Sequence, residues 1–274
     1  MLSVLAALAL TAAAPKPFLS GVVDTPATEV RPAFSPDGRC VLWGSITTKD
    51  DRKILQSCRE GDAWGKPAAV SFDTPANEFD PAFSPDGRTV YFFSNRPGGL
   101  GGDDLWAVDR DPATLAFGTA RNLGPRFNTP GDEWAPNPIA GARLIFSSSG
   151  HGGAGSQDLF EGDLAGETPV RNLGPGVNGP KDDFDATLLA DGRLVFASGD
   201  LKAESGVLLQ IASRGADGMF GGRRPLPAPV NCSAEINNGP AVDPRRPEAF
   251  FYSAYCPAVG PGRMDIFEVP VPAR

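Results

Sequence analysis

One long phrase that occurs twice is the strongest constraint on this chain. The run DTPATEVRPAFSPDGR, Asp24 to Arg39, returns almost letter for letter from Asp73 to Arg88, and weaker copies begin at Asn128, Asn178 and Asn231. One acidic marker stands in each copy: Glu29, Glu78, Glu133, Asp183 and Glu235. Their spacings of 49, 55, 50 and 52 residues indicate five structural units of about fifty residues.

Each unit repeats the same order of strand and turn signals. A short strand follows the marker, Ser-Pro-Asp-Gly or a related turn ends it, and an apolar second strand such as Val90 to Phe93 comes next. A Gly-rich loop, a third strand and a short fourth strand complete the unit. The 33 glycines and 28 prolines exclude a helical bundle, while 41% hydrophobic residues supply a core. Four antiparallel strands per unit predict the blade of a β-propeller.

The strand count predicts how the ring closes. The fifth copy contains three strands, and Phe18 to Gly21 precede the first copy where a fourth strand is needed. We therefore expect an all-β, five-bladed propeller over residues 14–274, closed by an amino-terminal strand in the last blade. A six-bladed ring is the alternative, but it would need about fifty more residues than the repeats leave unassigned.

The repeat resembles a known family. Pro32 to Arg39, its copy from Pro81 to Arg88 and the continuation from Val90 to Trp106 resemble the WD40-like (PD40) repeat of TolB and related bacterial periplasmic propellers. The resemblance covers nearly the whole chain after residue 13. It implies a propeller that serves as a scaffold for protein contacts in the cell envelope.

The amino terminus predicts export. Leu2 to Ala14 form an uncharged apolar run that is too short to cross a bilayer but long enough for a signal-peptide core. Small residues at 11–13 fit cleavage after residue 13, so residues 1–13 are interpreted as a signal peptide. The alternative is a buried first strand. Export predicts a periplasmic or secreted protein without a membrane span.

Four cysteines test the blade arrangement. In an oxidising compartment they allow three pairings. Cys40 opens the second strand of the first unit and Cys58 closes its third strand, while Cys232 and Cys256 fall in loops at one end of the fifth unit. The arrangement predicts Cys40–Cys58 and Cys232–Cys256 disulfides, against the alternative of four unpaired thiols.

The sequence offers little catalytic chemistry. The single histidine, His151, lies in a Gly-rich loop, and no nucleophile elbow, HExxH or CxxC motif is present. Asp104, Asp158 and Asp265 recur before third strands, where they favour loop capping over calcium binding. We expect no metal site and no cofactor.

The five markers permit two interpretations. Glu29, Glu78, Glu133, Asp183 and Glu235 are expected near one mouth of the channel, where they either bond the blade framework or hold a cation. Because every copy has one, we favour a structural role. Exposed positions that differ between copies are instead free to specify a partner. This criterion selects a candidate binding face of Arg31, Asp80, Asp185, Asn237, Arg96, His151 and Tyr255.

Three functional hypotheses follow. The first is a non-catalytic scaffold, monomeric, that binds a protein or peptide in the envelope. The second is a carbohydrate-active or other hydrolytic propeller that uses channel carboxylates such as Asp80, Glu133 and Asp185. The third is a structural module without a ligand. A net charge of −8 argues against nucleic-acid partners.

Overall fold

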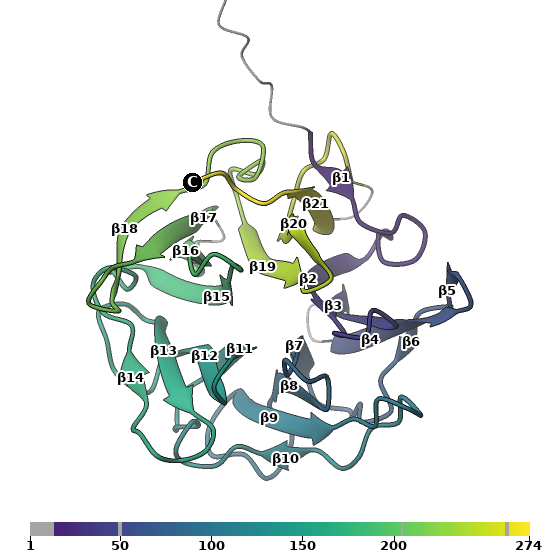
Figure 1. Ribbon diagram of the computed structural model, residues 1–274, viewed down its shortest axis with the longest axis horizontal. Helices are drawn as coiled ribbons and strands as arrows, with labels where there is room; N and C mark the ends of the chain where they lie inside the picture. The colour runs from purple at the N-terminus through teal and green to yellow at the C-terminus, as the bar shows by residue number, and fades with distance from the viewer. Residues whose placement is uncertain (1–13, 49–50, 204, 261–262) are drawn as a thin grey trace, which may run out of the picture.

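The computed structural model describes residues 14–48, 51–203, 205–260 and 263–274, so the predicted signal peptide lies outside the described residues. Five small antiparallel sheets surround a central axis (Figure 1). The first strand of every sheet is innermost, and these five strands contact one another around the ring. The structure confirms a five-bladed β-propeller and not a six-bladed one.

Each blade runs outward from the axis in sequence order, except that the last blade ends on the amino-terminal strand. Blade 1 comprises β2 (Thr28–Phe34), β3 (Cys40–Thr48), β4 (Asp51–Glu60), β5 (Ala63–Trp64) and β6 (Ala68–Ala69). Blade 2 comprises β7 (Glu78–Phe83), β8 (Thr89–Ser94), β9 (Asp104–Asp109) and β10 (Arg121–Asn122). Blade 3 comprises β11 (Glu133–Ile139), β12 (Arg143–Ser148), β13 (Asp158–Asp163) and β14 (Arg171–Asn172). Blade 4 comprises β15 (Asp182–Leu188), β16 (Leu194–Asp200), β17 (Ser205–Arg214) and β18 (Phe220–Pro225). Blade 5 comprises β19 (Asn237–Asp243), β20 (Arg246–Ala254), β21 (Asp265–Pro270) and β1 (Lys16–Pro17).

The amino-terminal strand closes the ring as predicted, two residues earlier than the sequence suggested. β1 pairs with β21 through Lys16 and Pro17, and the Phe18 N–H donates to the Ile266 carbonyl at 2.8 Å. The Phe18 ring then packs edge-on against Phe34 of blade 1 and Phe251 of blade 5. Closure therefore joins the two ends of the chain through both main-chain bonds and an aromatic contact.

The core lies between neighbouring blades. Second-strand residues are buried on both faces, as shown by Phe92, Phe146, Phe196 and Phe250, each with no exposed surface. One apolar cluster joins blades 2 and 3, and another joins blades 4 and 5. This burial explains why the second strands are uniformly apolar, without the alternation of a half-exposed strand.

Both predicted disulfides are present. Cys40 and Cys58 are directly opposite residues of β3 and β4, with Cα atoms 4.1 Å apart. Cys232 and Cys256 link the connection entering β19 to the connection leaving β20, with Cα atoms 6.0 Å apart. Each bridge lies within one blade or its entry loop.

An asparagine in the connection after three of the blades holds the third strand of that blade. Asn178 accepts a hydrogen bond from the Leu159 N–H and donates to the Leu159 carbonyl, at 2.8 and 2.9 Å. Asn128 and Asn231 make the same pair of bonds to Leu105 and Leu209. The amide therefore replaces a neighbouring strand where the short fourth strand has ended.

We predict that Asn178→Ala lowers the free energy of unfolding by about 2–3 kcal/mol, because two buried main-chain groups lose their partners. Urea denaturation measures the change. Exposed Asn95, which accepts one bond from the Asn77 N–H, provides the control, and Asn95→Ala should cost less than about 1 kcal/mol. Equal losses in the two variants would contradict this role.

Candidate functional site: the central channel

A bulge in every innermost strand builds the channel. The register of each first strand shifts just after the marker, between Val30 and Ala33 in β2 and at the matching place in the other four strands. The first bulged residue has a positive φ between 49° and 55° in all five blades. We call these residues the channel positions: Arg31, Asp80, Ala135, Asp185 and Gly239. Proline follows four of them, which blocks main-chain pairing at the bulge.

Arg31 extends across the channel to blades that are not its neighbours. Its Nη2 donates to the carbonyls of Pro136 in blade 3 and Ala186 in blade 4, at 3.2 and 3.4 Å. Its Nη1 lies 3.7 Å from an Asp185 carboxylate oxygen, and both side chains are at most 5% exposed. The Arg31 N–H donates to the Ser253 hydroxyl of blade 5 at 3.0 Å. One residue thus connects four blades.

The two channel carboxylates have different environments. Asp185 accepts the Gly239 N–H at 3.0 Å and pairs with Arg31. Asp80, only 4% exposed, has a buried Oδ1 without any hydrogen-bond partner among the described residues. Burial, together with the nearby Asp185 charge, raises the pKa of Asp80 to about 8. Two acids therefore share one guanidinium, and only one of them is paired with it.

The markers in blades 2 to 4 bond the framework. Glu133 accepts the N–H and hydroxyl of Thr129, four residues earlier, and the Ser148 hydroxyl. Glu78 makes the equivalent bonds to Thr74 and Ser94, and Asp183 accepts the Gly179 N–H. These contacts support the architectural interpretation and occupy Glu133, which the hydrolytic hypothesis used as a catalytic acid.

Glu29, the marker of blade 1, is less well satisfied. Its Oε1 accepts the Thr25 hydroxyl, but its buried Oε2 has no hydrogen-bond partner among the residues described. Burial is the main reason that the pKa of Glu29 rises to about 7. Blade 1 therefore carries a buried carboxyl group that binds a proton near neutral pH.

The prediction that Glu235 is the fifth marker is wrong. Asn237 begins β19, is fully buried and accepts the Ser233 N–H four residues earlier, which is the marker's contact. Gly239, two residues later, takes the channel position, while Glu235 is exposed. The fifth marker therefore lies two residues later than predicted, because an amide replaces the carboxylate in this degenerate copy.

The prediction of an exposed binding face is also wrong for most of its members. Arg31, Asp80 and Asp185 are buried at the axis, and Asn237 is buried in the framework. Tyr255 is half-buried. The three channel positions among them therefore vary between the copies because they line the channel interior, not because they face solvent.

Arg96 and His151 act as internal braces together with Arg223, which the sequence did not single out. Each reaches the main-chain carbonyl six residues before a marker: Arg96 reaches Phe72, His151 reaches Phe127, and Arg223 reaches Val177. Arg96 and Arg223 also pair with the markers Glu78 and Asp183. His151 instead packs against the rings of Phe146 and Phe160. Because different residue types bond this carbonyl in the three blades, the sequence did not reveal that the three positions have the same role.

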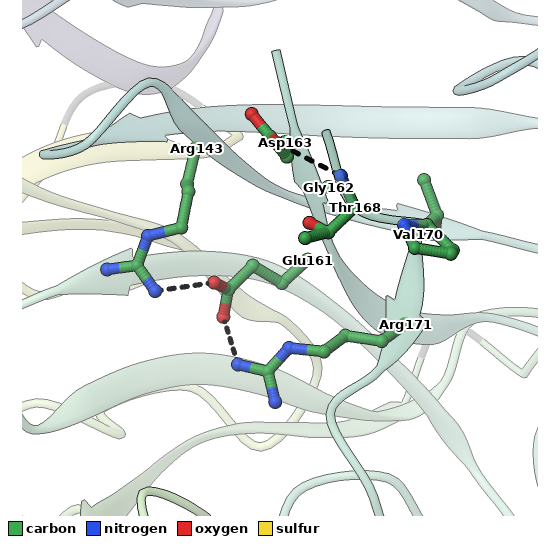
Figure 2. Close-up of a pocket in the computed structure, with 8 residues that line it drawn as sticks. Arg143, Glu161, Gly162, Asp163, Thr168, Val170 and Arg171 are labelled. Carbon is green, nitrogen blue, oxygen red and sulfur yellow. Dashed lines mark hydrogen bonds and ion pairs between the residues drawn. The ribbon is translucent and has the colours of Figure 1, made fainter. Parts of the chain in front are cut away.

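A hollow of about 360 Å³ lies on the outside of blade 3 (Figure 2). The buried Glu161 carboxylate is held between Arg143 and Arg171, at 2.7 and 2.9 Å. Asp163 caps the adjoining loop by accepting the N–H groups of Ala165, Glu167 and Thr168. Two cations and two carboxylates line this hollow, so its charges balance internally.

Exposed apolar side chains occur on both ends of the ring. We define the loop face as the end carrying the β8–β9, β12–β13, β16–β17 and β20–β21 connections and the connections between blades. It presents Leu100 and Val259, which are 43% and 39% exposed. Met219, 41% exposed, lies in the β17–β18 turn at the opposite end. Asp104 accepts the Leu100 N–H. In the β12–β13 connection, Asp158 accepts the Ala154 and Gly155 N–H groups in the same way.

The fold matches solved bacterial propellers. TolB from Acinetobacter baumannii superimposes with a TM-score of 0.55 at 19% identity, covering 89% of this chain and 54% of that one. A putative TolB from Agrobacterium tumefaciens gives 0.54 at 18% identity, covering 84% and 71%. A puromycin-hydrolysing peptidase of Mycobacterium tuberculosis gives 0.49 at 18% identity, covering 83% and 34%. No protein-family model and no curated protein matches the sequence.

The chain thus has a five-bladed propeller fold similar to the propellers of TolB structures. It spans about half the length of the A. baumannii protein. Among the described residues, no helix is long and apolar enough to cross a membrane, and no group of three or more acidic, His or Cys side chains is arranged to hold a metal.

We predict that the free energy of unfolding falls as pH rises from 3.8, the ordinary pKa of an aspartate, toward the Asp80 pKa of about 8. The native state holds this proton more tightly than the unfolded chain does, so stability is lost as the proton leaves, by at most about 1.4 kcal/mol per pH unit. Urea denaturation at several pH values should show that the free energy of unfolding falls less steeply with pH in Asp80→Asn than in the wild type. Part of the slope should persist because Glu29, with a pKa of about 7, acts in the same direction. Identical slopes in the wild type and the variant would rule out this assignment.

Proposed function

We propose that this protein is an exported, non-catalytic propeller of the TolB-like type that binds a protein or peptide in the bacterial cell envelope through its loop face. The observation that carries the proposal is that repeated positions and variable positions have different roles. The markers, the braces and the asparagines that hold third strands recur in several blades and stabilise the ring, whereas the loops between second and third strands differ in length and sequence. Variable loops on a rigid ring are suited to partner recognition.

Export is supported by the apolar run in residues 1–13 and by two disulfides that include all four cysteines. Disulfides form and persist in oxidising compartments such as the periplasm. A non-catalytic role is supported by the contacts of His151 and Glu133, since both side chains are engaged in holding loops. We expect the chain 14–274 to act as a monomeric propeller domain.

Leu100 is the best probe of the loop face. It is a large apolar side chain on a loop whose Gly101 and Gly102 lie directly against residues 129–132 of the neighbouring connection, so the loop presents it in a fixed position. A side chain that is already held in one position loses little conformational entropy when a partner covers it.

We predict that Leu100→Ser weakens capture of the partner from an envelope extract by about tenfold or more, whereas Met219→Ser, at the opposite end of the ring, leaves it unchanged. The measurement is quantitative pull-down with tagged wild type and both variants, followed by titration of the captured protein. The proposal fails if no protein is retained by the wild type, or if both variants lose binding equally.

A further inference from the structure

The Cys40–Cys58 disulfide has a cation on one of its two sulfurs. The Nη2 group of Arg110, which directly follows β9 in blade 2, donates to the Cys40 Sγ at 3.5 Å. The Arg59 guanidinium, next to Cys58 in the sequence, instead lies over the Trp64 ring, 4.5 Å from its centroid. The two sulfurs of this bridge are therefore in different electrostatic environments.

The Arg110 guanidinium is buried and only partly balanced. Its side chain is 1% exposed, its Nη1 donates to the Gly87 carbonyl at 3.4 Å, and the Asp37 carboxylate lies 3.6 Å away. Asp37 also pairs with Arg39 at 3.1 Å, so two guanidinium groups share one carboxylate. Asp111, the other acid that acts on Arg110, is exposed to solvent. Because a guanidinium stays charged at neutral pH, a negative charge that forms beside Arg110 gains a partner.

Thiol–disulfide exchange creates such a charge. When a thiolate attacks one sulfur of a disulfide, the other sulfur leaves as a thiolate, and a thiol of lower pKa leaves faster. A neighbouring arginine lowers the pKa of a cysteine, so Cys40 is the better leaving group and Cys58 the sulfur that is attacked. Exposure favours the same direction, because Cys58 is half-buried while Cys40 is only 2% exposed.

We infer that Cys58 is a site of modification by thiol compounds, with Cys40 as the leaving group and Arg110 as the residue that stabilises it. In this step the bond between the Cys40 and Cys58 sulfurs breaks, and a new S–S bond joins Cys58 to the external sulfur. The bonding electron pair stays on Cys40, which is thereby reduced. The external thiol gives its proton to solvent and is oxidised to a mixed disulfide.

The site is separate from the proposed partner surface. Cys40 begins β3 directly after the β2–β3 turn, at the end of the ring opposite the loop face. The inference therefore does not depend on the proposed function, and loss of partner capture would leave it intact.

The second disulfide provides an internal control. The Cys232 Sγ lies 3.6 Å from the Tyr252 hydroxyl, an uncharged group that stabilises a thiolate less than a guanidinium does. Cys232 is exposed, so this bridge also reacts with thiols. Its rate of reduction reports any change that affects the whole chain rather than the surroundings of Arg110.

Peptide mapping tests which sulfur is attacked. The full chain is exposed briefly to glutathione, the released thiol is alkylated with iodoacetamide, and the peptides are identified by mass spectrometry. We expect glutathione on Cys58 and the alkyl group on Cys40. Glutathione mainly on Cys40, or no adduct on either residue, would overturn the assignment.

A matched pair of variants tests the role of Arg110. Arg110→Met should slow the reduction of Cys40–Cys58 by dithiothreitol by about threefold or more and leave the rate for Cys232–Cys256 unchanged. Arg121→Met removes an exposed blade 2 arginine, 54% exposed and paired only with Asp109, and should change neither rate. Both rates are measured in one sample by quenched alkylation and mass spectrometry.

The direction of the change separates this role from a structural one. If Arg110 only stabilised the fold, its removal would loosen the junction of blades 1 and 2 and speed the reduction of Cys40–Cys58. Equal or faster reduction of Cys40–Cys58 in Arg110→Met would therefore overturn the inference. An equal slowing of both disulfides would also overturn it, because the effect would not be specific to the sulfur that Arg110 contacts.

Discussion

The guanidinium of Arg31 is the interaction on which the arrangement of the ring depends. In a propeller each blade packs only against its two neighbours, so non-adjacent blades meet only at the axis. Arg31 of blade 1 bonds main-chain carbonyls in blades 3 and 4, pairs with Asp185 and uses its own N–H to bond blade 5. Removing a charged group from water is costly, and these contacts offset part of that cost.

The bulges that place Arg31 at the axis are themselves unfavourable locally. Four channel positions hold non-glycine residues at positive φ, a conformation that costs of the order of 1 kcal/mol or more each. The surrounding framework maintains them, because the marker two residues earlier is bonded to its loop and to the second strand. The repeated positions therefore build the bulge, and the unrepeated ones, Arg, Asp, Ala, Asp and Gly, give the channel its asymmetry.

Much of the fold followed from the sequence, because turns and markers depend on local chemistry. Local signals of that kind predicted the Ser-Pro-Asp-Gly turns and the apolar second strands. The strand count then predicted the ring closure, and the positions of the cysteines in the blades predicted both disulfides. The channel was not predictable in the same way. A bulge reverses the side on which a residue points, so Arg31 and Asp80, which read as exposed polar residues, are buried. Asn237 took the place of an acid by supplying the same acceptor, and Arg223 came from a fourth strand, so sequence spacing could not reveal either.

A double-mutant cycle between Arg31 and Asp185 tests the central role of the axial contact most directly. Arg31→Met, Asp185→Asn and the double variant are compared with the wild type by urea denaturation, and Asn at position 185 still accepts the Gly239 N–H. We predict a coupling free energy of about 1–3 kcal/mol, because the two groups interact in a buried setting. Losses that add to within about 0.5 kcal/mol would show that the two residues stabilise the ring independently, and would contradict the account.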